Sequence, residues 1–209
     1  CYNISIEKIK RGLMKELIHE KIILTDCDGV LLAWEGAFHE WMKSKGFTKA
    51  EHGTYDISKS FGIPKTLGKK LVKEFNESAW MGFLPAYKDA RSGVAKLVEH
   101  GYKFIVITSL SLDPKAQMLR VSNLKNIFGK NVFIDVICLD TGEDKDEELV
   151  KFKDSGLWWI EDKPENAECG LKYGLKPILI EHDHNKDHAN DEIAYAYDWH
   201  EIFNIIEGA

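Results

Sequence analysis

Short runs rich in β-branched residues alternate with helix-forming segments along most of this chain, and this alternation limits the possible folds more than any other feature. Each of the last four runs follows a segment that starts at an Asp or a Pro or stops at a Gly, which are common helix boundaries. Strands that alternate with helices predict a parallel sheet with helices on both faces, an α/β, Rossmann-like fold. The runs are KIILT, KFIVIT, VFIDVICL, LWWIED and PILIEH.

Residues 34–84 interrupt this regular pattern. They hold many glycines, lysines and aromatic residues, and they contain two segments of helical character, residues 34–45 and 64–76, with a loop between them. We therefore expect a small helical cap inserted after the first strand. The core domain then consists of residues 1–33 and 85–209.

Boundary signals place the other expected helices. Pro stands at the first helical position of two of them, and Asp198-Trp199-His200-Glu201 resembles a capping box ahead of the last. Apolar residues at helical spacing predict a further helix before the first strand. These helices are expected over residues 5–19, 88–100, 144–152 and 164–174, and from residues 113 and 198 onward.

Charge and composition exclude several classes of function. Lys and Arg number 28 against 34 Asp and Glu, a net charge of −6, which argues against a nucleic acid partner. No apolar run approaches the roughly 18 residues of a membrane span, so we expect no membrane partner. The first residues are polar and amphipathic, unlike a signal peptide. The four cysteines lie far apart in sequence, as reduced core thiols do, and we expect a cytoplasmic protein.

Polar side chains gather at the points where the predicted strands stop. The carboxyl ends of parallel strands meet at one edge of a sheet, and ligands bind in the crevice beyond them. We therefore expect two acidic pairs, a hydroxyl pair and a lysine to face one crevice. These residues are Asp26, Asp28, Thr108, Ser109, Lys145, Glu161 and Asp162.

This set of side chains is suited to phosphoryl chemistry. Two or three carboxylates attract a hard divalent cation such as Mg²⁺, which prefers oxygen ligands. A hydroxyl and a lysine bind phosphate oxygens, and an aspartate can attack phosphorus to form an aspartyl-phosphate. A cation and a lysine together offset the charge of the phosphoryl group. The residues thus favour Mg²⁺-dependent hydrolysis of a phosphate monoester.

The motif D-x-D-G-V-L after a strand, a strand-ending Thr, a Lys and an E-D pair, in that order, resembles the haloacid dehalogenase superfamily. The resemblance implies that Asp26 is the nucleophile and Asp28 the general acid and base. It also implies that Thr108 and Lys145 bind the phosphate, and that Mg²⁺ is held by Asp26, Asp162 and the backbone carbonyl of Asp28. An Asp at the second position of the motif is typical of the phosphatases and phosphomutases of this superfamily.

Glu161 is expected to orient its neighbours rather than to bind the metal. The lysine assignment has neighbours that compete with it, Lys151 and Lys153. We favour Lys145 because it opens the predicted helix in D-K-D-E-E-L, as family members often do.

A closer likeness is to the 5′(3′)-deoxyribonucleotidase group. It is carried by W-E-G-A-F, G-F-L-P-A-Y-K-D-A, I-T-S and I-E-D-K-P-E-N. It implies a (deoxy)nucleoside monophosphate as the substrate, with Trp34 packing on the nucleobase and Ser109 as a second phosphate-contacting hydroxyl. One departure is Leu112, where that group carries a lysine. The alternative for Trp34 is a place in the core of the cap.

Other functions remain open at this stage. A phosphatase of another small phosphometabolite, such as a sugar phosphate, has the same catalytic groups. A noncatalytic or signalling phospho-acceptor domain is a more distant alternative, because receiver domains place their acidic pair and lysine in a different order. The histidines of EHDHNKDH, at 182, 184 and 188, are interpreted as loop histidines, since they lack the helical spacing or the cysteine partner of a metal site.

Overall fold

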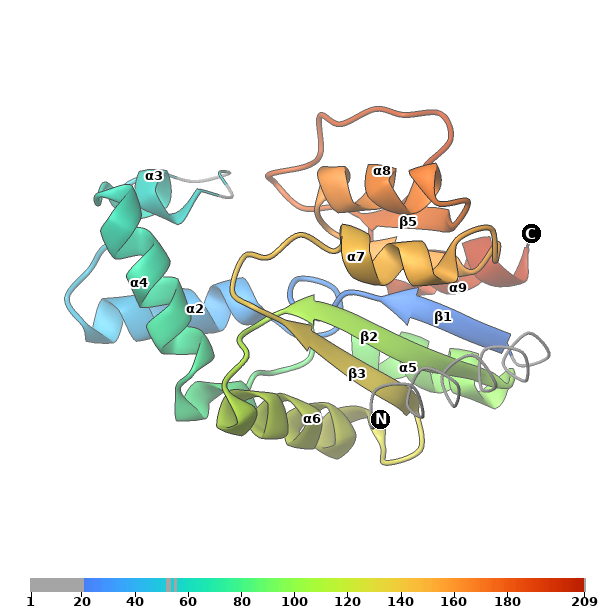
Figure 1. Ribbon diagram of the computed structural model, residues 1–209, viewed down its shortest axis with the longest axis horizontal. Coiled ribbons are helices and arrows are strands. Elements are labelled where there is room, and N and C mark those ends of the chain that lie inside the picture. Colours follow the sequence, from blue (N-terminus) through green and yellow to red (C-terminus); the bar gives the residue numbers. More distant parts are fainter. Residues whose placement is uncertain (1–20, 52–53, 55, 209) are drawn as a thin grey trace, which may run out of the picture.

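The computed structural model describes residues 21–51, 54 and 56–208, and its core is an α/β layered domain (Figure 1). Within these residues one sheet has six strands, all parallel, in the order β3-β2-β1-β4-β5-β6. This confirms the predicted α/β, Rossmann-like class. The strands are β1 (Lys21–Thr25), β2 (Tyr102–Ser109), β3 (Phe133–Leu139), β4 (Trp158–Glu161), β5 (Lys176–Ile180) and β6 (Ala194–Ala196).

Helices cover both faces of the sheet. Neighbouring strand residues point to opposite faces, so Ile23 of β1 packs into one core cluster and Leu24 into another. The first cluster receives α5 (Ala90–Glu99), α6 (Pro114–Phe128) and α9 (Trp199–Glu207). The second receives α7 (Asp146–Leu149), the short 3₁₀ helix η2 (Val150–Phe152) and α8 (Pro164–Lys172).

A helical insertion follows β1 and lies beside the carboxyl ends of the strands (Figure 1). Its aromatic side chains pack on one another: the Phe38 ring lies 5.3 Å from Phe75 and 6.0 Å from Phe61, centroid to centroid. This confirms the expected cap as part of the fold, whereas its division from the core at residues 34 and 84 stays a prediction. The insertion comprises α2 (Trp34–Ser44), α3 (Ile57–Phe61), α4 (Lys65–Asn76) and the 3₁₀ helix η1 (Ala79–Gly82).

Some elements differ from the sequence prediction. β6, α3 and η1 were not expected, because each has five residues or fewer and carries no readable periodicity. The helix expected over residues 5–19 lies outside the described residues. At the last helix the Asp198 side chain accepts from the Glu201 amide at 3.0 Å, as the capping box predicts. In the described part of the chain, no helix is long and apolar enough to cross a membrane.

Candidate active site

Asp26 directly follows β1 at the carboxyl edge of the sheet, and Gly29, in the turn after it, lies close to Asp162. The Asp26 amide still donates to the carbonyl of Ile160 at 2.8 Å, which fixes its backbone to β4. Gly29 has a φ of +80°, and a Cβ there would lie 2.4 Å from Asp162 Oδ2. Only glycine fits both the backbone conformation and this close approach.

Three carboxylates meet at this edge around one ammonium group. Ligand oxygens of Asp26, Glu161 and Asp162 lie within 4.8 Å of one another, and all three residues are buried. Lys145 Nζ is 2.8 Å from Asp26 Oδ1 and 2.8 Å from Glu161 Oε1. Glu161 Oε2 also accepts from the Asp162 amide at 2.7 Å, so Glu161 contacts both its neighbour and the lysine. Asn166 donates to Glu161 from α8.

Burial sets the protonation of this cluster. It raises the pKa of Asp26 to about 8, with Glu161 adding to the rise and Lys145 opposing it. Burial, Glu161 and Asp26 likewise raise the pKa of Asp162. Burial alone lowers the pKa of Lys145, but Asp26 and Glu161 outweigh it and keep the ammonium charged. Three buried carboxyl groups against one ammonium form a set that a divalent oxygen-seeking cation fits, as Mg²⁺ does.

Arg120 of α6, a helix that packs on the sheet, forms an ion pair with Asp28. The guanidinium donates to both carboxylate oxygens, with Nη2 3.0 Å from Oδ2. The Arg120 side chain is 0% exposed, whereas Asp28 keeps 23% of its side chain exposed. Nothing in the sequence pattern of α6 indicated this contact, because a lone arginine in a helix is usually solvated.

The two hydroxyl residues at the end of β2, Thr108 and Ser109, differ in their hydrogen bonding. Thr108 is buried, and its Oγ1 has no hydrogen-bond partner among the described residues. Ser109 Oγ instead donates to the carbonyl of Glu143 at 2.7 Å. A buried hydroxyl without a partner is costly unless a ligand completes it. Thr108 therefore marks a place where an acceptor such as a phosphate oxygen fits.

The alternative lysines lie away from this cluster. Lys151 pairs with Glu148 on the surface, and its side chain is half exposed. Lys153 is likewise exposed. Among these three lysines, Lys145 alone contacts the carboxylates.

A cavity of about 1310 Å³ separates the cap from the sheet edge. Trp34 lines it, and so do Asp26, Thr108 and Asp162. The Trp34 ring stacks on Phe38 at 4.7 Å, and its Nε1 donates to Asn76 Oδ1 at 2.9 Å. Trp34 is thus both a part of the aromatic packing of the cap and a wall of the cavity.

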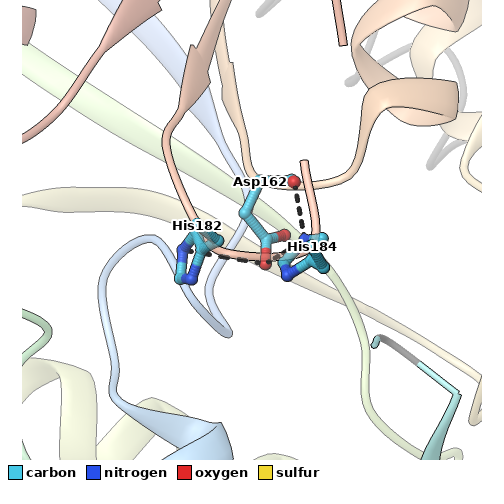
Figure 2. A group of neighbouring side chains, drawn as sticks. All are labelled: Asp162, His182 and His184. Atoms are coloured by element: carbon cyan, nitrogen blue, oxygen red, sulfur yellow. Dashed lines mark hydrogen bonds and ion pairs between the residues drawn. The ribbon is translucent and has the colours of Figure 1, made fainter. Parts of the chain in front are cut away.

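His182 and His184, in the loop after β5, also line the site, although their spacing predicts ordinary loop histidines. His184 Nε2 lies 3.1 Å from the carbonyl of Asp162 (Figure 2). His182 Nε2 lies 2.8 Å from the carbonyl of Gly29. Burial lowers the pKa of His182 to about 4, so its imidazole is neutral. His188 is elsewhere, bonded to Glu168 and Tyr195. The position of EHDHNKDH directly after a predicted strand was the available signal.

Comparisons with known proteins agree with this architecture. No family model matches the chain. A 32.4 kDa protein of enterobacteria phage T4, encoded in the Gp30-rIII intergenic region and uncharacterized, is 27% identical over 192 residues, 87% of this chain and 68% of the phage protein. A predicted phosphatase from Clostridium acetobutylicum superposes with a TM-score of 0.62 at 14% identity, over 91% of this chain and 99% of that one.

A haloacid dehalogenase-like hydrolase from Streptococcus pneumoniae gives a TM-score of 0.59 at 13% identity, over 90% of this chain and 98% of that one. The chain has a haloacid dehalogenase-like fold. CbbY from Rhodobacter sphaeroides, solved with phosphate, shares this haloacid dehalogenase-like fold with a TM-score of 0.58 at 16% identity, over 88% of this chain and 96% of CbbY. At these identities the structural likeness concerns the fold alone.

Proposed function

We propose that this protein is a Mg²⁺-dependent phosphomonoester hydrolase that acts on a small phosphorylated metabolite through an aspartyl-phosphate intermediate. The observation that carries the proposal is the placement of Asp26 on the cavity wall. Lys145 lies 2.8 Å from its carboxylate, and Thr108, whose hydroxyl has no hydrogen-bond partner in the described part of the chain, lines the same cavity. A nucleophile, a cation and a hydroxyl donor then face one phosphoryl group.

In the first half of the reaction, a carboxylate oxygen of Asp26 bonds to phosphorus as the bond to the leaving oxygen breaks. Asp28 supplies the proton that the leaving oxygen takes. Lys145 and Thr108 donate to the phosphoryl oxygens. Both oxygens of Asp28 accept from Arg120, and in the protonated acid one of them also donates to the leaving oxygen.

In the second half, Asp28 takes a proton from water, and the water oxygen bonds to phosphorus. The bond to Asp26 breaks, and inorganic phosphate leaves. Arg120, which donates to both carboxylate oxygens of Asp28, orients them for this step.

Asp26, Asp162 and the backbone carbonyl of Asp28 would hold Mg²⁺. When bound, the cation would offset the negative charge of these carboxylates and of the phosphoryl group. Burial, together with the neighbouring Glu161, raises the pKa values of Asp26 and Asp162, and a bound cation would favour the ionised form of both carboxylates.

A sugar phosphate or a similar small phosphometabolite has more support as the substrate than the nucleoside monophosphate expected from the motifs. A variant of CbbY from Rhodobacter sphaeroides was solved with xylulose-(1,5)bisphosphate, a phosphorylated sugar. On the cap side, Lys65 and Lys69 of α4 line the cavity one helical turn apart. Both are exposed, so a leaving group with a further acidic group would find positive charge there.

A nucleoside monophosphate is the second candidate, and Trp34 is the observation that favours it. Its indole lines the cavity, where a base could stack on an aromatic face. Because the indole also stacks on Phe38, a base would contact only the part of the Trp34 ring that faces the cavity.

The reduced state of the described cysteines supports the expected cytoplasmic location. Cys27, Cys138 and Cys169 are free thiols. Such thiols persist in a reducing compartment.

A phosphate-release screen tests the function and separates the two substrate classes. The panel contains sugar phosphates, phosphoglycolate, nucleoside monophosphates and an aryl phosphate, each with Mg²⁺ and with a chelator. We expect release that needs Mg²⁺, that is absent in Asp26→Asn, and that is fastest on a substrate bearing a second acidic group. Release that is undiminished in excess chelator would contradict the metal assignment.

A matched pair of cap variants tests the role of the lysines. Lys69→Gln should raise KM for substrates with a second acidic group and leave the aryl phosphate little changed. Lys70→Gln is the control, since Lys70 is exposed and is not among the residues that line the cavity. Equal effects of the two variants would remove the support for an acidic leaving group.

A further inference from the structure

The loop that follows β5 sets two imidazole rings against the carboxylate of Asp162. Asp162 Oδ2 is 3.9 Å from His182 Nε2 and 3.8 Å from His184 Nε2 (Figure 2). One ligand atom of each of the three residues lies within 4.8 Å of the others. The two rings lie on either side of the carboxylate in Figure 2, so His182 Nε2, His184 Nε2 and Asp162 Oδ2 surround one space.

These side chains are held rather than mobile on the surface. Side-chain exposure is 10% for His182, 13% for His184 and 9% for Asp162, and all three line the cavity. The His182 ring stacks on Tyr87 at 4.8 Å and on His184 at 5.1 Å. Asn185 fixes the loop by donating to the carbonyls of Asp162 and Ile180.

The outer partner of His182 resembles that of a metal-binding histidine. The Tyr87 hydroxyl lies 3.3 Å from Nδ1, on the far side of the ring from Asp162. Metal-bound imidazoles usually make such a hydrogen bond through the nitrogen that does not bind the metal, and it fixes the tautomer. In the structure Nε2 faces the Gly29 carbonyl and donates to it, so Nδ1 accepts from Tyr87. If the ring proton moved to Nδ1, His182 would donate to the Tyr87 oxygen and free the Nε2 lone pair.

We propose that Asp162, His182 and His184 form a second cation site, selective for a borderline transition metal ion such as Zn²⁺ or Co²⁺. Two imidazole nitrogens and one carboxylate oxygen are the ligands that such ions prefer, whereas Mg²⁺ prefers oxygen alone. Ligand distances of about 2.0–2.2 Å require the three side chains to move closer together than the 3.8 and 3.9 Å that separate the two Nε2 atoms from Asp162 Oδ2. On binding, each Nε2 gives up its hydrogen bond to a backbone carbonyl, and in His182 the proton moves to Nδ1, beside the Tyr87 oxygen.

This site and the oxygen cluster share one residue. Asp162 also belongs to the group formed with Asp26 and Glu161. An ion bound by the two histidines therefore competes for the Asp162 carboxylate with the Mg²⁺ of the proposed phosphatase. Zn²⁺ then acts as an inhibitor of that activity, a consequence that rests on the proposed function, whereas the binding itself does not.

Calorimetric titration of the metal-stripped full chain with Zn²⁺ tests the binding directly. Visible absorption of the Co²⁺ form reports nitrogen ligands independently. We expect one Zn²⁺ per chain and an affinity that falls tenfold or more in His184→Gln. His188→Gln is the matched control, because His188 lies in the same loop and bonds instead to Glu168 and Tyr195. Its affinity should stay within about twofold, a change small against the roughly 10–100-fold that loss of even an outer hydrogen-bond partner of a metal ligand costs.

Asp26→Asn separates the two cation sites. It removes a ligand of the oxygen cluster and leaves the histidines intact, so Zn²⁺ affinity should be retained. Binding lost in Asp26→Asn but kept in His184→Gln would overturn the proposal, as would no measurable Zn²⁺ binding. Thermal unfolding of each variant excludes misfolding as the cause of lost binding, and His182→Gln provides a second ligand variant. If phosphate release is also found, its inhibition by Zn²⁺ should be relieved in His184→Gln.

Discussion

The guanidinium of Arg120 donates to both carboxylate oxygens of Asp28, and it does so from a side chain with no exposed surface. Arg120 Nη1, the nitrogen that donates to Asp28 Oδ1, also lies 2.7 Å from Cys27 Sγ. The buried arginine therefore fixes two consecutive residues of the D-x-D loop. Because the acid and base role is assigned to Asp28, Arg120 is a positioning residue for the proposed reaction.

Removing Asp28 should destabilise the protein through the charge that is left behind. Asp28→Ala leaves the buried Arg120 unpaired, which should lower the free energy of unfolding by about 3 kcal/mol. Adding Arg120→Met should restore much of that loss, because the buried guanidinium without its carboxylate partner is then removed. Denaturant unfolding of the two single variants and the double variant measures the coupling. Strictly additive effects would show that the pair does not interact energetically.

Lys145 should matter to catalysis far more than its exposed neighbour. Lys145→Ala should reduce the rate of phosphate release by about 10²–10³-fold, the usual scale for one lost electrostatic contact to developing charge. Lys151→Ala should cost little, since Lys151 pairs with Glu148 on the surface. Steady-state rates of both variants are the measurement, and the reverse order of effects would move the phosphate lysine along the chain.

The metal-free protein should lose stability as the pH rises. The folded pKa of Asp26 is raised to about 8 from 3.8 by burial, so its stabilising contribution is complete below about pH 4 and is lost as the pH rises through about 8. Mg²⁺ should offset this loss, because it stabilises the ionised carboxylate. The increase in Tm on adding Mg²⁺ should therefore grow towards pH 8.

Asp26→Asn is the control for that pH dependence. With no ionisable group at this position, the variant in chelator should be more stable than the parent protein at about pH 8. Thermal unfolding in chelator across this range makes the comparison. A parent protein that gains stability over Asp26→Asn as the pH rises would contradict the raised pKa.

Trp34 provides a test of the second substrate candidate. If a base stacks on its exposed part, the contact contributes roughly 1–3 kcal/mol, so Trp34→Ala should raise KM for nucleoside monophosphates about tenfold to a hundredfold. A sugar phosphate should be much less affected. Equal losses on both substrates would assign Trp34 to cap packing through Phe38 and Asn76.

The sheet and the cluster at its edge were predictable, because the carboxyl ends of parallel strands lie at one edge of the sheet for any loop sequence. Asp26 and Asp162 follow two buried strands that lie side by side, and a parallel sheet has no other place for them. Lys145 lies beside Asp26, although its helix is shorter than expected and continues as a 3₁₀ turn. Their catalytic roles stay predictions.

The contacts that hold this cluster could not be predicted in the same way. Arg120 reaches Asp28 from a helix far along the chain, and a lone arginine in a helix gives no sign of burial. His182 and His184 lie in an irregular loop, where neither period nor spacing reports which way a side chain points. β6 has three residues, too few for an alternating pattern. Tertiary packing, rather than local propensity, determines these features.

The central claim is that Asp26 becomes phosphorylated during turnover. Asp28→Asn should slow breakdown of the intermediate, because the water then lacks its base. The measurement is peptide mass spectrometry of this variant after acid quenching during turnover of an aryl phosphate with Mg²⁺. We predict one phosphoryl group on the peptide that contains Asp26, absent when Asp26→Asn is added. Phosphate release by the parent protein with no phosphoryl group on that peptide in either form would contradict the account.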